Sequence, residues 1–176
     1  MFTQLTPHVQ AAIEAGRRIL NGAYNVETAS AFLFSAAVVG DFFWPSPRRG
    51  RALTRAFPQR ADDMRHLVGL PDEEPSDLDV IRNDLTHVDE RLEELYLANP
   101  NGPMLAWGNG AASREGTRRY MNFDPANHVL HSLGREVDVE DVVAWLENLL
   151  GRIGRVSLEL MIRSPHLGEV DPATGA

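Results

Sequence analysis

The sequence predicts a mainly α protein, a helical bundle with a small β-hairpin, and three observations lead to this fold class. Several long segments place apolar residues three and four positions apart, which is the spacing of one helix face. One short region, near residues 118–133, has instead the character of two strands around a turn. Prolines and glycines separate these segments. The chain has 176 residues, a natural size for one domain. We therefore expect one helical domain over 1–163 and a loose C-terminal tail over 164–176.

Composition excludes several classes of site. The chain has no cysteine, which excludes a disulfide framework, a thiolate nucleophile and a cysteine-ligated metal. Its net charge of −8 gives no overall attraction to nucleic acid. All 17 basic residues are arginines, which we interpret as the codon bias of a GC-rich genome; the alternative is a use of arginine for phosphate contacts. The sequence contains no Walker loop, dinucleotide fingerprint or serine nucleophile elbow, and no cofactor is expected.

The N-terminal region and the apolar segments favour a cytoplasmic protein. No basic segment followed by an apolar run opens the sequence, so we expect no signal peptide. The longest apolar stretch, from Ala29 to Trp44, is interrupted by polar residues and is short for a membrane span. We interpret it as a buried core helix.

Helices are predicted throughout the first part of the chain. The first runs from about Pro7 to Gly22, with Thr6 as its N-cap. The second runs from about Glu27 to Phe43, and its apolar residues surround nearly the whole circumference, so it should lie at the centre of the fold. The segment Arg48–Val68 is interrupted at Pro58, which predicts two short helices or one kinked helix.

The most regular predicted helix runs from Ser76, its N-cap, to about Leu97. Its apolar stripe continues without a miss through Leu78, Ile81, Leu85, Val88, Leu92 and Leu95. The residues on the other faces of this helix are polar. On a helical wheel of ~100° per residue, one shoulder of the stripe carries Arg82 and Asp89, and a separate polar stripe roughly opposite the core carries Asn83, His87, Glu90 and Glu94. Taken alone, this pattern is typical of the solvated face of an amphipathic helix with weak ion pairs.

The last third of the chain mixes strands and a helix. Residues 104–117 are predicted to form an irregular loop. The segments 118–123 and 128–133 are predicted to pair as a hairpin around the turn 124–127. Asp138 is the expected cap of a last long helix, from about Val139 to Ile162.

The order Arg-Asn-x-x-x-His, formed on a predicted helix by Arg82, Asn83 and His87, resembles the signature of the HEPN superfamily. That signature is an arginine, often followed by Asn, Asp or His, and then a histidine five to seven positions after the arginine. The run that follows, Val88–Leu92, is similar to that of uncharacterised bacterial members. A toxin-type form has tyrosine two places after the histidine, where this chain has Asp89. A helical bundle with the motif helix late in the bundle also agrees with the family.

The resemblance implies a metal-independent endoribonuclease, or a protein that binds RNA or nucleotides without cleaving them. The chemistry would be attack of a ribose 2′-OH on the adjacent phosphate, with His87 as proton carrier and Arg82 as the cation for the phosphate. Asn83 completes the motif, and Asp89 and Glu90 are candidate supporting residues. One motif supplies one histidine and one arginine, which point ~140° apart on an ideal helix. We therefore expect a homodimer that brings two motif helices together; the alternative is a non-catalytic helical interaction protein.

Other candidates are local. A basic patch on this acidic chain is either the solvated end of a helix or a surface for RNA phosphates, and it comprises Arg48, Arg49, Arg51 and Arg55. His128 and His131 should point to opposite faces of a strand, which makes them a poor metal pair. Asp62 and His66 share a helix face, but two ligands make weak support for a metal site, and no metal is expected.

Overall fold

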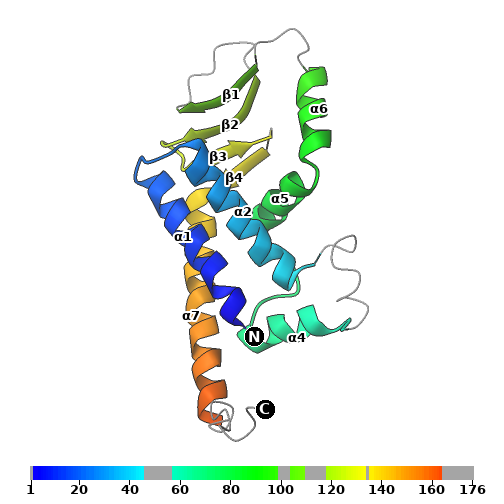
Figure 1. The fold of residues 1–176 in the computed structure, drawn as a ribbon, viewed down its shortest axis with the longest axis vertical. Helices are drawn as coiled ribbons and strands as arrows, with labels where there is room; N and C mark the ends of the chain where they lie inside the picture. Colours follow the sequence, from blue (N-terminus) through cyan, green and yellow to red (C-terminus); the bar gives the residue numbers. More distant parts are fainter. Residues whose placement is uncertain (1, 46–56, 99–103, 110–117, 134, 164–176) are drawn as a thin grey trace, which may run out of the picture.

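The computed structural model describes residues 2–45, 57–98, 104–109, 118–133 and 135–163 (Figure 1). The predicted fold class, mainly α with a small hairpin, is confirmed. In chain order the described elements are η1 (Phe2–Gln4), α1 (Thr6–Leu20), α2 (Val26–Phe43), α4 (Arg60–Val68), α5 (Ser76–Thr86), α6 (Val88–Ala98), β1 (Met104–Asn109), β2 (Arg118–Asp124), β3 (Val129–Ser132), β4 (Arg135–Asp138) and α7 (Val139–Arg163).

Three long helices form the main body. Helix α1 packs along both α2 and α7, and the sheet lies at one end of this bundle (Figure 1). The close approach of α1 to α7 depends on Gly16, where a Cβ atom would collide with the side chain of Val143. The large side chains that are fully buried include Ile19, Phe32, Phe43, Leu146 and Leu149. Burial of these apolar side chains is the main favourable term for the fold.

Helix α2 is the central helix, as its sequence predicted. Asn25 caps it, because its side chain accepts a hydrogen bond from the backbone N–H of Thr28 at 2.8 Å. By length and composition, Val26–Phe43 could also cross a membrane, with a mean hydropathy of 1.4. A core helix passes the same test, and α2 has buried residues around its circumference and packs against α1, α4 and α5.

Two short helices complete the helical part around α2. Helix α4 contacts α2 and α7, and the buried guanidinium of Arg65 donates a hydrogen bond to the carbonyl of Phe43 at the end of α2. Trp44 also anchors the chain after α4, since its indole N–H donates to the carbonyl of Asp72 at 2.8 Å. Helix α5 packs on α2 and meets strand β4, so it joins the helical body to the sheet.

The sheet has the strand order β1-β2-β3-β4. The predicted hairpin is confirmed as the antiparallel pair β2–β3, with Asn122 opposite His131. Strand β4 continues the antiparallel run, and Leu130 faces Val137 across it. The predicted turn is also present: Asp124 accepts a hydrogen bond from the backbone N–H of Ala126 at 2.9 Å.

Several local predictions were wrong. Residues 104–109 form strand β1 rather than a loop, because they pair in parallel with β2. This pairing is a tertiary contact, and the local sequence shows no alternation of apolar and polar residues that would predict it. Thr6 and Ser76 are the first helical residues of α1 and α5, not their N-caps, which are Leu5 and Pro75. His128 lies in the turn before β3, with a left-handed φ of 57°. The predicted tail over 164–176 lies outside the described residues.

Candidate functional site

The predicted helix over residues 76–97 is broken at His87, and this is the main correction at the candidate site. Helix α5 ends at Thr86 and α6 begins at Val88, with His87 between them at φ −123° and ψ 34°. The backbone N–H of His87 still donates to the carbonyl of Asn83 at 3.0 Å, and the carbonyl of His87 accepts from the N–H of Arg91 at 2.9 Å. The apolar stripe is therefore continuous in sequence, but one helical wheel does not describe both halves.

The sequence around His87 accounts for the break. Thr86 and Val88 are β-branched and have lower helix propensity than straight-chain residues. Asp89 and Glu90 then fill the first turn of α6, where negative charge is favourable next to the helix N-terminus. These preferences stabilise a new helix start at the point where the old helix ends.

Arg82, the arginine of the motif, is bound inside the fold. Its Nη2 lies 2.6 Å from Oε2 of Glu74 and its Nε donates to Oε1 of Glu74 at 3.1 Å. Its Nη2 also donates to Asp79 at 2.9 Å. The side chains of Arg82 and Glu74 are 13% and 10% exposed. Burial raises the pKa of Glu74, while the contact with Arg82 lowers it by a smaller amount. This bidentate ion pair fixes the loop before α5 to the helix.

A glycine in α2 makes room for this ion pair. A Cβ atom at Gly40 would lie 3.0 Å from Oε1 of Glu74 and 3.7 Å from Cδ of Arg82. The first distance is shorter than ordinary van der Waals contact, so the pair sits directly against the backbone of α2. Glycine, which has no Cβ atom, provides this space at position 40.

His87 lies at the bend with its ring partly exposed. Its Nδ1 is 2.9 Å from Oε2 of Glu90, and the two side chains are 28% and 67% exposed. A carboxylate on one ring nitrogen orients a histidine and fixes its tautomer, which leaves the other nitrogen for proton transfer. Asn83 is half-buried, and Asp89 is exposed on the first turn of α6. Of the three motif residues, Asn83 and His87 are joined through the backbone, while Arg82 is held by Glu74.

Asp84 is a residue that the sequence reasoning missed. Its side chain is 3% exposed, and its Oδ1 lies 3.5 Å from Nε of Arg135 and 3.9 Å from Nε of Arg91. Neither of its oxygens accepts a hydrogen bond from the described residues. Burial raises the pKa of Asp84 to about 6, although Arg135 and Arg91 act in the opposite direction. Its position gave a signal, because Asp84 is three residues after Ile81 and four before Val88, both members of the apolar stripe.

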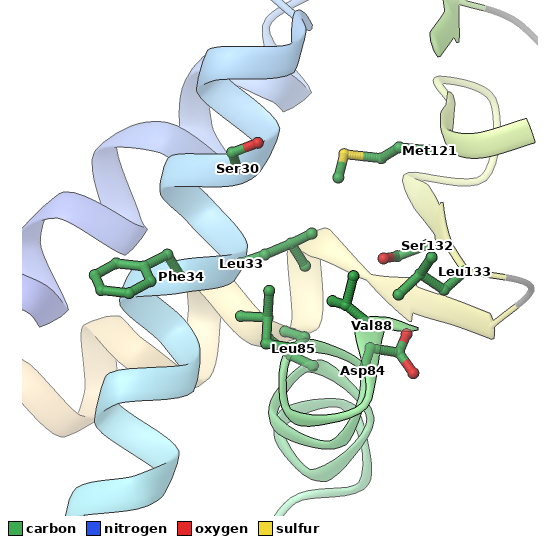
Figure 2. A pocket seen from close by; sticks show the side chains of 10 residues that line it. Ser30, Leu33, Phe34, Asp84, Leu85, Val88, Met121, Ser132 and Leu133 are labelled. Atoms are coloured by element: carbon green, nitrogen blue, oxygen red, sulfur yellow. The ribbon is translucent and has the colours of Figure 1, made fainter. Parts of the chain in front are cut away.

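A cavity of about 250 Å³ adjoins Asp84. It lies between α2, the junction of α5 and α6, and strands β2 and β3 (Figure 2). Its lining is mostly apolar and consists of Ser30, Leu33, Phe34, Ile81, Asp84, Leu85, Val88, Met121, Ser132 and Leu133. In Figure 2 the Asp84 carboxyl is turned toward Leu133, whereas Leu85 points toward α2. Among these lining residues the charged one is Asp84, which lies in α5 close to the bend at His87.

The other candidates from the sequence are dispersed. The basic patch of Arg48, Arg49, Arg51 and Arg55 lies outside the described residues. His128 and His131 each lie near a different carboxylate: Glu140 at 2.8 Å and Glu136 at 3.6 Å. Asp62 pairs with Arg65, on its own helix. Within the described ranges, no group of three or more His, Asp or Glu side chains is arranged to hold a metal ion.

No protein family, no curated protein and no solved structure matches this chain.

Proposed function

We propose that this chain is a HEPN-like protein that binds RNA, and cleaves it without a metal ion, at the junction of α5 and α6. The observation that carries the proposal is the placement of His87 at the bend, where Glu90 holds Nδ1 at 2.9 Å and the ring remains partly exposed. An oriented and accessible histidine is the group that transfer of a 2′-OH proton requires. The resemblance of Arg82, Asn83 and His87 to the HEPN signature gives the same location.

The proposed reaction transfers the phosphate from O5′ to the neighbouring O2′ of the same RNA strand. A histidine nitrogen accepts the proton of the ribose 2′-OH, the O2′–P bond forms and the P–O5′ bond breaks. The leaving O5′ takes a proton from a second acid, and the products end in a 2′,3′-cyclic phosphate and a free 5′-OH. One chain offers one such histidine at the bend, so we propose a homodimer in which the second copy of His87 is the acid.

The experiment is an RNA cleavage assay with purified protein in EDTA, together with light scattering. Cleavage in EDTA with cyclic phosphate ends supports the enzyme. RNA binding without cleavage supports a binding member of the family. A monomer at micromolar concentration contradicts the two-copy site, even if RNA binds.

A second candidate is a non-catalytic interaction protein, and the end of α7 favours it. Leu158, Met161 and Ile162 lie on one face of this helix and are 59%, 71% and 69% exposed. The end of α7 projects beyond the bundle (Figure 1). Neighbouring apolar side chains on a surface mark protein contact sites. This candidate predicts that Leu158→Glu changes the binding of a protein partner or of a second copy, and that no RNA in a broad panel binds.

A further inference from the structure

Asp84 brings together two arginines from different elements. Arg91 belongs to α6 and Arg135 is the first residue of β4, yet the Nε atoms of both lie within 3.9 Å of the same carboxyl oxygen. In Figure 2 the Asp84 carboxyl lies beside Leu133, in the segment that leads into β4. One buried carboxylate thus lies close to two guanidinium groups that belong to different elements.

Arg91 follows His87 by one helical turn, and the side chains of both arginines are partly exposed. The backbone N–H of Arg91 donates to the carbonyl of His87 at 2.9 Å, so Arg91 lies one turn after His87 at the start of α6. The side chains of Arg91 and Arg135 are 24% and 34% exposed. Neither arginine donates a hydrogen bond to Asp84. Both guanidinium groups thus lie near Asp84 while their side chains keep some exposure to solvent.

Apart from Asp84, the carboxylates close to Arg91 and Arg135 are exposed, so a phosphate could displace them. Nη1 of Arg91 donates to Glu94 at 2.6 Å, and that carboxylate is 64% exposed. Glu90 faces His87, and Glu136, close to Arg135 in sequence, faces His131. An exposed ion pair is weak, so an incoming phosphate can take the place of Glu94. Arg82 has no such freedom, because its bidentate partner Glu74 is buried.

We propose that Arg91 and Arg135 bind a phosphate of RNA beside His87, and that Asp84 is the positioning residue that holds both guanidinium groups in place. This inference rests on the proposed function and deepens it, since it assigns the phosphate contact to two residues outside the HEPN motif. Guanidinium groups present paired N–H donors that match phosphate oxygens. Arg82, the arginine expected from the resemblance, then has the structural role of holding Glu74.

The first measurement detects the anion site without requiring RNA. Inorganic phosphate is titrated into the full chain while the side-chain Nε–Hε signals of the arginines are followed by NMR. The signals of Arg91 and Arg135 should shift together with one dissociation constant, and that of Arg82 should not follow them. Shifts spread over exposed arginines such as Arg17, without saturation at Arg91 and Arg135, overturn the inference.

The second measurement is the affinity for a fluorescein-labelled single-stranded RNA of random sequence. Arg91→Gln and Arg135→Gln should each weaken binding by about 10–100-fold, because each removes charge-assisted hydrogen bonds. Arg17→Gln is the matched control, since Arg17 forms an exposed ion pair with Glu147 on another part of the surface. It removes the same charge and should change the affinity by less than about twofold.

Two further variants make the same change in charge but should have opposite effects on RNA affinity. Asp84→Asn and Glu94→Gln both remove one negative charge close to Arg91, and simple attraction would make both bind RNA more tightly. Glu94→Gln should indeed strengthen binding by about two- to fivefold, because it releases Nη1 of Arg91. Asp84→Asn should weaken binding by about tenfold or more, because the two guanidinium groups lose the carboxylate that positions them.

The outcomes separate this inference from the function on which it rests. If the wild type binds RNA and neither Arg91→Gln nor Arg135→Gln changes the affinity, the inference is overturned but the proposed function is not. Saturating phosphate shifts at both arginines, with no RNA bound, support an anion site and overturn the proposed function. If folded Asp84→Asn binds RNA more tightly than the wild type, its positioning role is overturned.

Discussion

Arg82 and Glu74 form a bidentate ion pair, with Nη2–Oε2 and Nε–Oε1 distances of 2.6 Å and 3.1 Å, inside the fold and against the backbone of Gly40. The arginine that most resembles a catalytic residue in the sequence therefore has a structural partner. Its partner lies eight residues earlier, before the start of α5, so the contact closes the loop that follows α4. Under the proposed function, the cation that binds the phosphate beside His87 must therefore be a residue other than Arg82.

Loss of Arg82 should lower stability strongly. Arg82→Ala leaves the buried carboxylate of Glu74 without its main cation, and breaking such a pair costs ~3–5 kcal/mol in the free energy of unfolding. Urea denaturation at neutral pH measures the change. The double variant Arg82→Met with Glu74→Met removes both charges and should recover most of the loss. A cost below ~1 kcal/mol for Arg82→Ala would show that the pair behaves as an exposed one.

Two glycines in helices should respond in opposite ways to alanine. A Cβ atom at Gly151 meets nothing within 4 Å, so Gly151→Ala should raise stability by ~0.5–1 kcal/mol through helix propensity. At Gly40 the new Cβ would lie 3.0 Å from Oε1 of Glu74, which is fixed by Arg82. Gly40→Ala should therefore lower stability by ~1–2 kcal/mol. Thermal melts of both variants give the comparison, and equal stabilisation by both would mean that Glu74 is free to move.

Asp84 should make stability fall as the pH rises. Burial raises the pKa of Asp84 from 3.8 to about 6 in the folded chain. Between these values the folded state holds a proton that the unfolded state has released, so the folded state loses stability as pH increases through this window. The effect is at most ~3 kcal/mol and is complete above pH ~6.

The measurement is the difference in unfolding free energy between Asp84→Asn and the wild type. Because asparagine stays neutral, the variant should be about equal to the wild type near pH ~4 and more stable by up to ~3 kcal/mol at pH ~7. Asp89→Asn removes the same charge from an exposed position on α6 and controls for net charge. A difference that is independent of pH would mean that the carboxyl is not desolvated in the folded state. Together with the RNA-binding measurement, we therefore expect Asp84→Asn to be more stable than the wild type at neutral pH and to bind RNA more weakly.

Much of the fold could be predicted because its signals are local. Asp138 accepts a hydrogen bond from the N–H of Asp141 at 3.0 Å and starts α7, as expected of a cap. Asp124 does the same in the hairpin turn. The break at His87 was missed because an unbroken apolar stripe outweighed two β-branched neighbours. Strand β1 was missed because its pairing with β2 is parallel, and a parallel pair is not marked in the sequence by a tight turn.

The exposure of His87 could be predicted from the sequence, but the contacts of Arg82 and Asp84 could not. The sequence placed His87 on an exposed face, and its ring is partly exposed beside Glu90. It could not show that Glu74 reaches Arg82, because a loop residue has no fixed register with a helix. It also could not show that Arg135 approaches Asp84, since that contact depends on how β4 meets α5. Long-range ion pairs of this kind follow from tertiary packing and leave no periodic trace.

The glutamate beside His87 should affect proton transfer more than stability. Glu90→Gln keeps the shape of a side chain that is 67% exposed, so unfolding should change by less than ~0.5 kcal/mol. If Glu90 orients His87 for catalysis, the variant should shift the pH dependence of RNA cleavage and reduce its rate by ~10-fold, with RNA affinity unchanged. A rate and pH profile equal to those of the wild type would leave Glu90 without a role.

The most direct test of the account is RNA cleavage in EDTA by the wild type and by His87→Ala, both confirmed as folded by their melting curves. The account predicts wild-type cleavage that leaves 2′,3′-cyclic phosphate ends, and a rate lower by ~10²–10⁴ in the variant. Equal cleavage by the two proteins, cleavage that stops in EDTA, or no cleavage and no binding across a broad RNA panel would contradict it.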